Sequence, residues 1–115
     1  MPFVDISVIA VPDDQKDAYI EHCRAADALL KEAGALSVTE NWGVDVPDGK
    51  ITDFRKAVQA EAGETVAVGW IVWPDKARRD AGWEKFMQDD RMTKLNPPFD
   101  GKRMIYGGFE TIHEL

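Results

Sequence analysis

Three segments of the chain, residues 3–11, 35–44 and 64–74, follow the period of two that is typical of β-strands. The first two alternate between apolar and polar positions, whereas the third is apolar on both of its faces, as expected for a strand in the middle of a sheet. A fourth strand is predicted over residues 103–111. The pattern therefore predicts a four-stranded sheet.

Two segments between these strands show the three- and four-residue spacing of amphipathic helices. The first begins after the first strand, with Asp13 or Asp14 as its predicted N-cap, and is expected to end at Gly34. The second is predicted over residues 76–88, with Asp75 as its N-cap. The apolar stripe of the first helix consists of Tyr19, Cys23, Ala26, Leu30 and Ala33.

The resulting order is strand, helix, strand, strand, helix, strand, which predicts an α+β protein with the ferredoxin-like βαββαβ fold. In this fold a four-stranded antiparallel sheet carries two helices on one face. Residues 51–62 are predicted to be mostly loop, with a short amphipathic turn around 54–58. With 115 residues, 44% of them hydrophobic and 30% charged, the chain is expected to form one domain over 1–115.

The other face of the predicted sheet needs a cover. Two helices shield one face only, yet the central strand is apolar on both. A second copy of the chain, related by a two-fold axis, would bury this face at roughly 1.5 to 3 kcal/mol for each large apolar side chain. The sequence therefore predicts a homodimer in which the two sheets face each other.

The charge balance disfavours two classes of partner. Lys and Arg total 14 against 21 Asp and Glu, a formal charge of -7, which repels nucleic-acid phosphates and anionic membranes. The sequence shows neither a membrane-spanning run nor a secretory signal, so a cytoplasmic location is expected. The single cysteine, Cys23, cannot form an intrachain disulfide and is expected to be a small core residue.

Three segments together resemble the YbaA-like family of bacterial proteins of unknown function: VPDGKITDFRKAV at 46–58, GETVAVGWIVWPDKARRDA at 63–81 and PFDGKRMIYGGFE at 98–110. The resemblance covers nearly the whole chain and implies the dimeric α+β barrel form of the ferredoxin-like fold. It implies no activity and no catalytic residues. The chain departs from the family at Ile6, where a glycine is expected, and in a shorter segment at 90–99.

Glu40 is the first candidate for chemistry. Alternation places it on the same strand face as Leu36, Val38 and Trp42, where a carboxylate would lose water and its pKa would rise. Such a group can act as a general base. The alternative is a partly exposed glutamate of an edge strand, or one paired with an arginine.

Two further groups are candidates for a ligand pocket. Trp42, Trp70 and Tyr106 could line an apolar cavity and orient a ligand, or they could serve core packing and the dimer interface. Asp53 and Arg55 lie in the long connection, where they could bind a polar molecule or form a salt bridge that fixes the loop. The sequence leaves these alternatives open.

The chain shows no motif for a metal or a cofactor, so neither is expected. His22 and Cys23 are neighbours on a helix, and their side chains diverge by about 100°. Phosphate-binding loops and haem motifs are also absent. The pair Gly107 and Gly108 interrupts the last strand and is predicted to mark a β-bulge or a close approach to the partner chain.

These observations leave three classes of function, and they do not decide whether the protein is an enzyme. The first is a homodimer that binds or converts a small molecule in a pocket, by analogy with the fold. The second is a non-catalytic interaction or stress-response homodimer, whose aromatic residues serve association. The third, RNA binding, fits worst because the chain is acidic and has no basic stripe.

Overall fold

A computed structural model describes all residues 1–115. Its four strands, β1 (Phe3–Pro12), β2 (Ser37–Trp42), β3 (Glu64–Trp73) and β4 (Ile105–Glu110), form one antiparallel sheet. The strand order is β2-β3-β1-β4, so β1 and β3 lie in the middle and β2 and β4 form the edges. The predicted four-stranded sheet is confirmed, although β2 and β4 are shorter than the pattern suggests.

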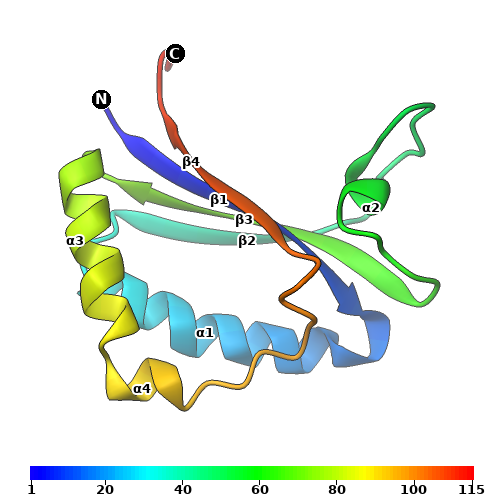
Figure 1. The fold of residues 1–115 in the computed structure, drawn as a ribbon, viewed down its shortest axis with the longest axis horizontal. Helices are drawn as coiled ribbons and strands as arrows, with labels where there is room; N and C mark the ends of the chain where they lie inside the picture. The colour runs from blue at the N-terminus through cyan, green and yellow to red at the C-terminus, as the bar shows by residue number, and fades with distance from the viewer.

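The structure contains four α-helices, two more than the sequence pattern predicts. The long ones are α1 (Lys16–Glu32), after a 3-10 turn η1 (Asp13–Gln15), and α3 (Lys76–Met87). Two single-turn helices follow β2 and α3: α2 (Phe54–Ala57) and α4 (Asp90–Thr93). Figure 1 shows α1 running beneath the sheet and α3 at one end of it, with α4 leading from α3 towards α1. No helix of the structure combines the length and the apolar composition that a membrane span requires.

The predicted N-cap of the first helix is wrong, and that of the helix α3 is confirmed. No side chain caps α1, because Asp13 and Asp14 lie in η1 instead. The carboxylate of Asp13 accepts a hydrogen bond from the hydroxyl of Thr65, which joins the end of β1 to the start of β3. Asp75 accepts a 2.8 Å hydrogen bond from the backbone amide of Arg78, as an N-cap should.

The main core lies between the sheet and the helices. Side chains of β1 and β3 that face α1 and α3 are deeply buried because they pack against the apolar stripe of α1, and Trp73 has no exposed surface. Two clusters make up this core: Ile9, Val11, Tyr19, Cys23 and Ala67; and Phe3, Leu30, Ala35 and Trp73.

The opposite side of the sheet is covered at one end only. Val58, next to α2, packs against the apolar residues at that end and has no exposed surface. Towards the other end Trp70, Ile105 and Phe109 are 38%, 45% and 54% exposed. We call this uncovered region the open sheet face; it comprises Val4, Ile6, Val68, Trp70, Ile105 and Phe109.

The glycine pair in β4 does not form the predicted bulge. Gly107 pairs with Ile6 and Gly108 with Asp5, so the ladder is regular through both positions. A Cβ atom on Gly108 would lie 2.7 Å from the ring of Phe3. Gly108 therefore allows a close approach of β4 to an aromatic side chain of the same chain.

Candidate functional site

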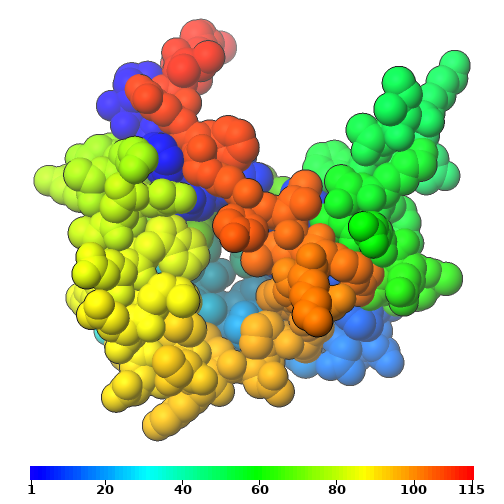
Figure 2. All heavy atoms as spheres, viewed as in Figure 1, coloured from blue at the N-terminus to red at the C-terminus, as the bar shows by residue number.

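A large cleft opens between the sheet and the helices α1 and α3, beside the core that joins them. Its volume is about 700 Å³, and residues from all four strands and both long helices line it. Figure 2 shows this hollow between the yellow α3–α4 segment and the orange segment that precedes β4, with atoms of the cyan segment at its floor. Much of its lining is apolar: Leu30, Val38, Ile71, Trp83, Phe86, Met87 and Met104. We call this space the sheet–helix cleft.

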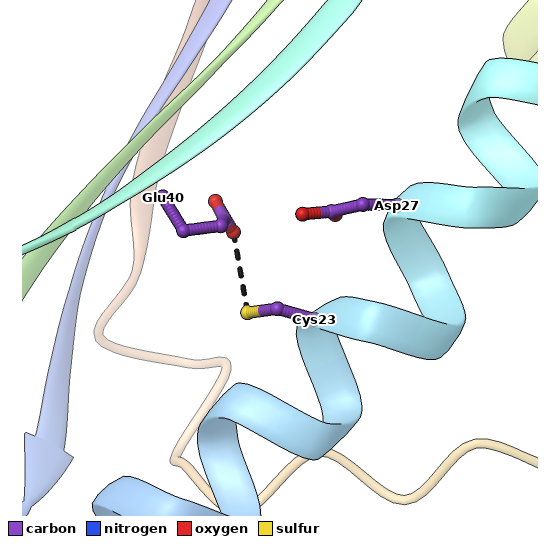
Figure 3. A group of neighbouring side chains, drawn as sticks. All are labelled: Cys23, Asp27 and Glu40. Atoms are coloured by element: carbon purple, nitrogen blue, oxygen red, sulfur yellow. Dashed lines mark hydrogen bonds between the residues drawn. The ribbon is translucent and has the colours of Figure 1, made fainter.

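Three polar side chains meet at one end of the cleft. Cys23 and Asp27 are one turn apart on α1 and therefore point the same way, and Glu40 approaches them from the edge strand β2 (Figure 3). One ligand atom from each lies within 4.8 Å of the others. The thiol of Cys23 donates a 3.3 Å hydrogen bond to Oε2 of Glu40. We call these three residues the carboxylate–thiol cluster.

The neighbouring strand makes room for Glu40. Glu40 pairs with Gly69 on β3, and a Cβ atom at position 69 would lie only 2.1 Å from Oε1 of Glu40. With glycine at this position, the carboxylate of Glu40 can lie over Gly69 and line the cleft. The glycine is thus part of what places the carboxylate.

Burial and like charge both favour protonation of the cluster. Burial first, and then the negative charge of Glu40, raise the pKa of Asp27 to about 7. Partial burial also raises the pKa of Glu40, although the residue keeps exposed surface on the edge strand and its hydrogen bond from Cys23 acts in the opposite direction. The pKa of the Cys23 thiol rises to about 12, chiefly through burial, so the sulfur remains a thiol at neutral pH. The cluster therefore gains or loses a proton near neutrality, as a general acid or base must.

The cluster is reachable from two sides. Asp27 and Glu40 line the sheet–helix cleft and also a smaller pocket of about 270 Å³. Tyr19 and Arg24 line that smaller pocket as well. Water or a ligand can therefore approach the carboxylates from the cleft and from this outer pocket.

A second polar group forms the wall of the cleft beside α3. The carboxylate of Asp5 accepts hydrogen bonds from Nε1 of Trp73 at 2.9 Å, from Nε1 of Trp83 at 2.8 Å and from Nη2 of Arg79 at 2.7 Å. Arg79 also contacts Asp80 at 3.0 Å. Because Asp5 thereby ties α3 to β1 and β3, we assign it a role in positioning the wall.

The carboxylate–thiol cluster contains groups that can bind a metal, although no metal is expected from the sequence. The sequence shows no metal motif, yet folding brings a thiol and two carboxylates within ligand distance of one another. Sites for zinc usually have four ligands, or three protein ligands and a water. Cys23, Asp27 and Glu40 could supply three.

The structure separates the aromatic candidates. Glu40, Trp42 and Tyr106 are on the sheet face that contacts the helices, and both Glu40 and Tyr106 line the cleft. Trp42 packs against Tyr19, with their ring centroids 6.3 Å apart, and is not part of the cleft lining. Trp70 borders the cleft, but alternation along β3 directs its indole to the open sheet face.

Asp53 and Arg55 lie away from the cleft and hold the loop that contains α2. Asp53 caps α2 through a 2.7 Å hydrogen bond from the amide of Lys56 and also accepts one from the amide of Gly49. These amides lower the pKa of Asp53 to about 2. Arg55 donates to the carbonyl oxygens of Glu61 and Glu64. In the structure both residues stabilise the loop.

Sequence reasoning missed Asp27. A signal is present in the sequence, because Asp27 is four residues after Cys23, which belongs to the apolar stripe of the same helix. A carboxylate next to that stripe is expected to face the sheet in part. Its proximity to Glu40, in contrast, depends on how β2 lies against α1 and has no local signature.

Two solved structures share the fold over almost the whole chain. A dimeric ferredoxin-like protein from an uncultured marine organism is 11% identical, with a TM-score of 0.63, and the match covers 99% of this chain and 98% of the other. A protein named as a candidate antibiotic biosynthesis monooxygenase from Bacillus cereus is 9% identical, with a TM-score of 0.60 and coverage of 99% and 96%. At these identities the likeness concerns the fold alone.

Sequence comparison identifies nearer relatives. The chain is 56% identical over 114 residues to the uncharacterized protein YbaA of Escherichia coli strain K12 and to YbaA of Shigella flexneri, and each match covers 97% of both proteins. A family model described as "Protein of unknown function (DUF1428)" matches residues 2–101. These matches confirm the resemblance to YbaA-like proteins, and the chain belongs to the DUF1428 family.

Proposed function

We propose that this protein binds a small organic molecule in the sheet–helix cleft. The observation that carries the proposal is the cleft itself: about 700 Å³, a mostly apolar lining, and a few polar groups that converge at one end. Ligand sites typically have 300 to 1,000 Å³ and this same division of apolar wall and polar anchor. The Bacillus cereus neighbour, named as a candidate monooxygenase, supports a small-molecule role for the fold.

The carboxylate–thiol cluster is the reactive part of the proposed site. A carboxylate oxygen of Asp27 lies within 4.8 Å of one of Glu40, and the pKa of Asp27, raised to about 7, suits proton transfer at neutral pH. In the proposed site, Glu40 accepts a proton from a bound ligand. Asp27 then donates a proton to that ligand or accepts a second proton from it. Cys23 keeps the Glu40 carboxylate in place through its hydrogen bond.

The proposed active form is a homodimeric ferredoxin-like α+β barrel. Its interface would be the open sheet face, where Trp70, Ile105 and Phe109 remain exposed in the single chain. The marine structural neighbour is named as dimeric, which supports this assembly. A specific interface of standard size buries about 800 Å² from each partner. Covering the open sheet face would leave the cleft, on the other side of the sheet, free for a ligand.

A fragment screen by amide NMR tests the proposed site. Cross-peaks of cleft residues such as Ile71 and Trp83 are expected to shift with some of the fragments. Ala26 lines the cleft and Ala25, its neighbour, is exposed. Ala26→Phe should therefore weaken fragment binding at least about tenfold, a loss of roughly 1.4 kcal/mol, whereas Ala25→Phe should not. A screen in which no fragment moves the cleft cross-peaks would refute the proposal.

A further inference from the structure

The cleft contains more negative than positive charge. Its lining includes four carboxylates, Asp5, Asp27, Glu40 and Asp80, but only one Lys or Arg, which is Arg79. Arg79 is already engaged, because it binds Asp5 at 2.7 Å and Asp80 at 3.0 Å. Asp27 and Glu40 are therefore left without a counter-charge from the cleft wall.

No other cation of the chain neutralises this pair. Neither Asp27 nor Glu40 forms an ion pair with any Lys, Arg or His. Arg24, at the rim of the outer pocket, pairs with Glu21 at 2.8 Å and is largely exposed. His22 also lines the cleft, but burial lowers its pKa and thus favours the neutral ring. Asp27 is partly buried and Glu40 keeps exposed surface, so the pair lacks a counter-charge from the protein and is open to a cation from outside.

The remaining cleft wall suits the apolar part of a ligand. Trp83 and Phe86 form an edge-to-face pair with centroids 5.4 Å apart, and Tyr106 and Met87 add further apolar surface that is exposed in the single chain. Aromatic faces also attract organic cations. A ligand that matched both parts of the cleft would carry one positive charge on an apolar body.

We infer that the sheet–helix cleft selects an apolar amine, whose ammonium group replaces the missing counter-charge between Asp27 and Glu40 while its apolar body packs against Trp83 and Phe86. This inference rests on the proposed small-molecule site and names its ligand class. A divalent cation is the other occupant that the cluster chemistry allows. The amine is favoured because a metal ion would fill only the cluster and leave the apolar cleft without an occupant.

Three probes that share a naphthalene ring test the ligand class: 1-naphthylmethylamine, 1-naphthalenemethanol and 1-naphthoic acid, titrated at pH 7.5 by calorimetry and amide NMR. We expect the amine to bind at least about tenfold more tightly than the alcohol, which corresponds to roughly 1.4 kcal/mol, and the acid to bind most weakly. Shifts in the cross-peaks of Trp83 and Asp27 should accompany binding of the amine.

Matched variants then test the charged pair. Asp27→Asn with Glu40→Gln should abolish the preference for the amine over the alcohol. Glu21→Gln with Glu32→Gln also removes two negative charges, but from exposed positions of α1, and should preserve that preference. Thermal unfolding verifies that both double variants fold. If the first pair of substitutions left the preference intact, the inference would be wrong.

The remaining outcomes separate the inference from the proposed function. If alcohol and amine bind equally in the cleft, the small-molecule site stands and the cationic class is overturned. If none of the probes shifts a cleft cross-peak, the inference fails, while the fragment screen still decides the proposed function. If Zn²⁺ binds with unit stoichiometry to the wild type and not to the Asp27→Asn/Glu40→Gln variant, and the amine does not bind, the cluster is a metal site and the inference is overturned.

Discussion

The thiol of Cys23 on α1 donates a hydrogen bond of 3.3 Å to Oε2 of Glu40 on β2, across 17 positions of sequence. Asp27, one helical turn after Cys23, brings a second carboxylate to the same point. Each of the three groups alone would be an ordinary surface or core residue. Together they join the helix α1 to the edge strand β2, and the charge of Glu40 affects the proton affinity of Asp27.

Replacement of Glu40 should lower the pKa of Asp27. The negative charge of Glu40 is the second cause of the raised pKa, after burial, so Glu40→Gln should move it down from about 7 but not to its ordinary value of 3.8. Carbon-detected NMR titration of the aspartate carboxyl groups measures this change. Glu21→Gln, at an exposed position of the same helix, is the control. An unchanged pKa of Asp27 in Glu40→Gln would show that the two carboxylates do not interact.

Asp27 should make the protein less stable as the pH rises from about 4 to about 7. The pKa of Asp27 is higher in the folded state than in the unfolded state, so the proton on Asp27 stabilises the fold. This stabilisation is lost as the pH rises and Asp27 ionises. Asparagine does not ionise, so Asp27→Asn lacks this pH-dependent loss of stability. At pH 8 the variant should be more stable than the wild type by at most about 4 kcal/mol, or roughly 1.4 kcal/mol per pKa unit. At pH 4 the two should be nearly equal.

Urea unfolding of both proteins at pH 4 and pH 8 measures this difference. Two other groups near Asp27 titrate in this pH range: Glu40, whose pKa is also raised, and His22, whose lowered pKa acts in the opposite direction. Tyr19 and Cys23 also face Asp27 but keep their protons throughout this range. The contribution of His22 is common to both proteins and cancels in the comparison with Asp27→Asn. Asp48→Asn, in an exposed loop, should follow the wild type. A wild type that gains stability relative to Asp27→Asn at high pH would contradict the prediction.

Two glycine substitutions should differ in their cost to stability and in their effect on the carboxylate–thiol cluster. In Gly108→Ala the new methyl group would meet the ring of Phe3 at 2.7 Å, and this overpacking should cost about 1 to 3 kcal/mol. In Gly69→Ala it would meet Oε1 of Glu40, the end of a flexible side chain that can move away. Gly69→Ala should therefore cost less than about 1 kcal/mol but break the Cys23 hydrogen bond and lower the pKa of Asp27.

Denaturant unfolding and the carboxyl titration together distinguish these two outcomes. Each substitution serves as the control for the other, because both place one methyl group in the interior of a strand. A destabilised Gly69→Ala protein with an unchanged Asp27 pKa would show that Glu40 does not depend on this space.

Loss of Asp5 should destabilise the protein strongly. Asp5 is 12% exposed at its side chain and accepts hydrogen bonds from Trp73, Trp83 and Arg79, so Asp5→Ala leaves three donors without their partner. The expected cost is about 3 to 5 kcal/mol. Asp80→Ala removes the other carboxylate that binds Arg79, but this carboxylate is 48% exposed, and its loss should cost at most about 1 kcal/mol. Similar costs for the two variants, measured by urea unfolding, would argue against the role assigned to Asp5.

The open sheet face should control assembly. Sedimentation is expected to show a dimer at micromolar concentration, and Phe109→Glu should convert it to a monomer because it would bury a charge without a partner. Leu36→Glu changes another exposed apolar residue, which lies just before β2 and is 54% exposed, and should leave the dimer intact. A wild type that sediments as a monomer would rule out the proposed assembly.

Much of the architecture could be predicted from local pattern. A period of two identified four strands, and spacings of three and four identified α1 and α3, because buried faces impose these periods on the sequence. The cap at Asp75 followed the same logic and is present. The cap at Asp13 failed because a tertiary partner, Thr65, binds that carboxylate instead. The bulge at Gly107 and Gly108 also failed, since the reason for Gly108 is the ring of Phe3, a contact between strands.

Local pattern is enough to predict the strands, the long helices, the apolar character of both sheet faces and the position of Glu40 on the face towards the helices. These properties depend on neighbours a few residues apart, so composition and spacing encode them. Packing of the whole fold is needed to bring Asp27 and Cys23 to Glu40, to place Trp42 and Trp70 on opposite faces, and to pair Arg79 with Asp5 and Asp80. The physical reason is that charge and proton affinity depend on distances across the fold, which packing between α1, α3 and the sheet sets.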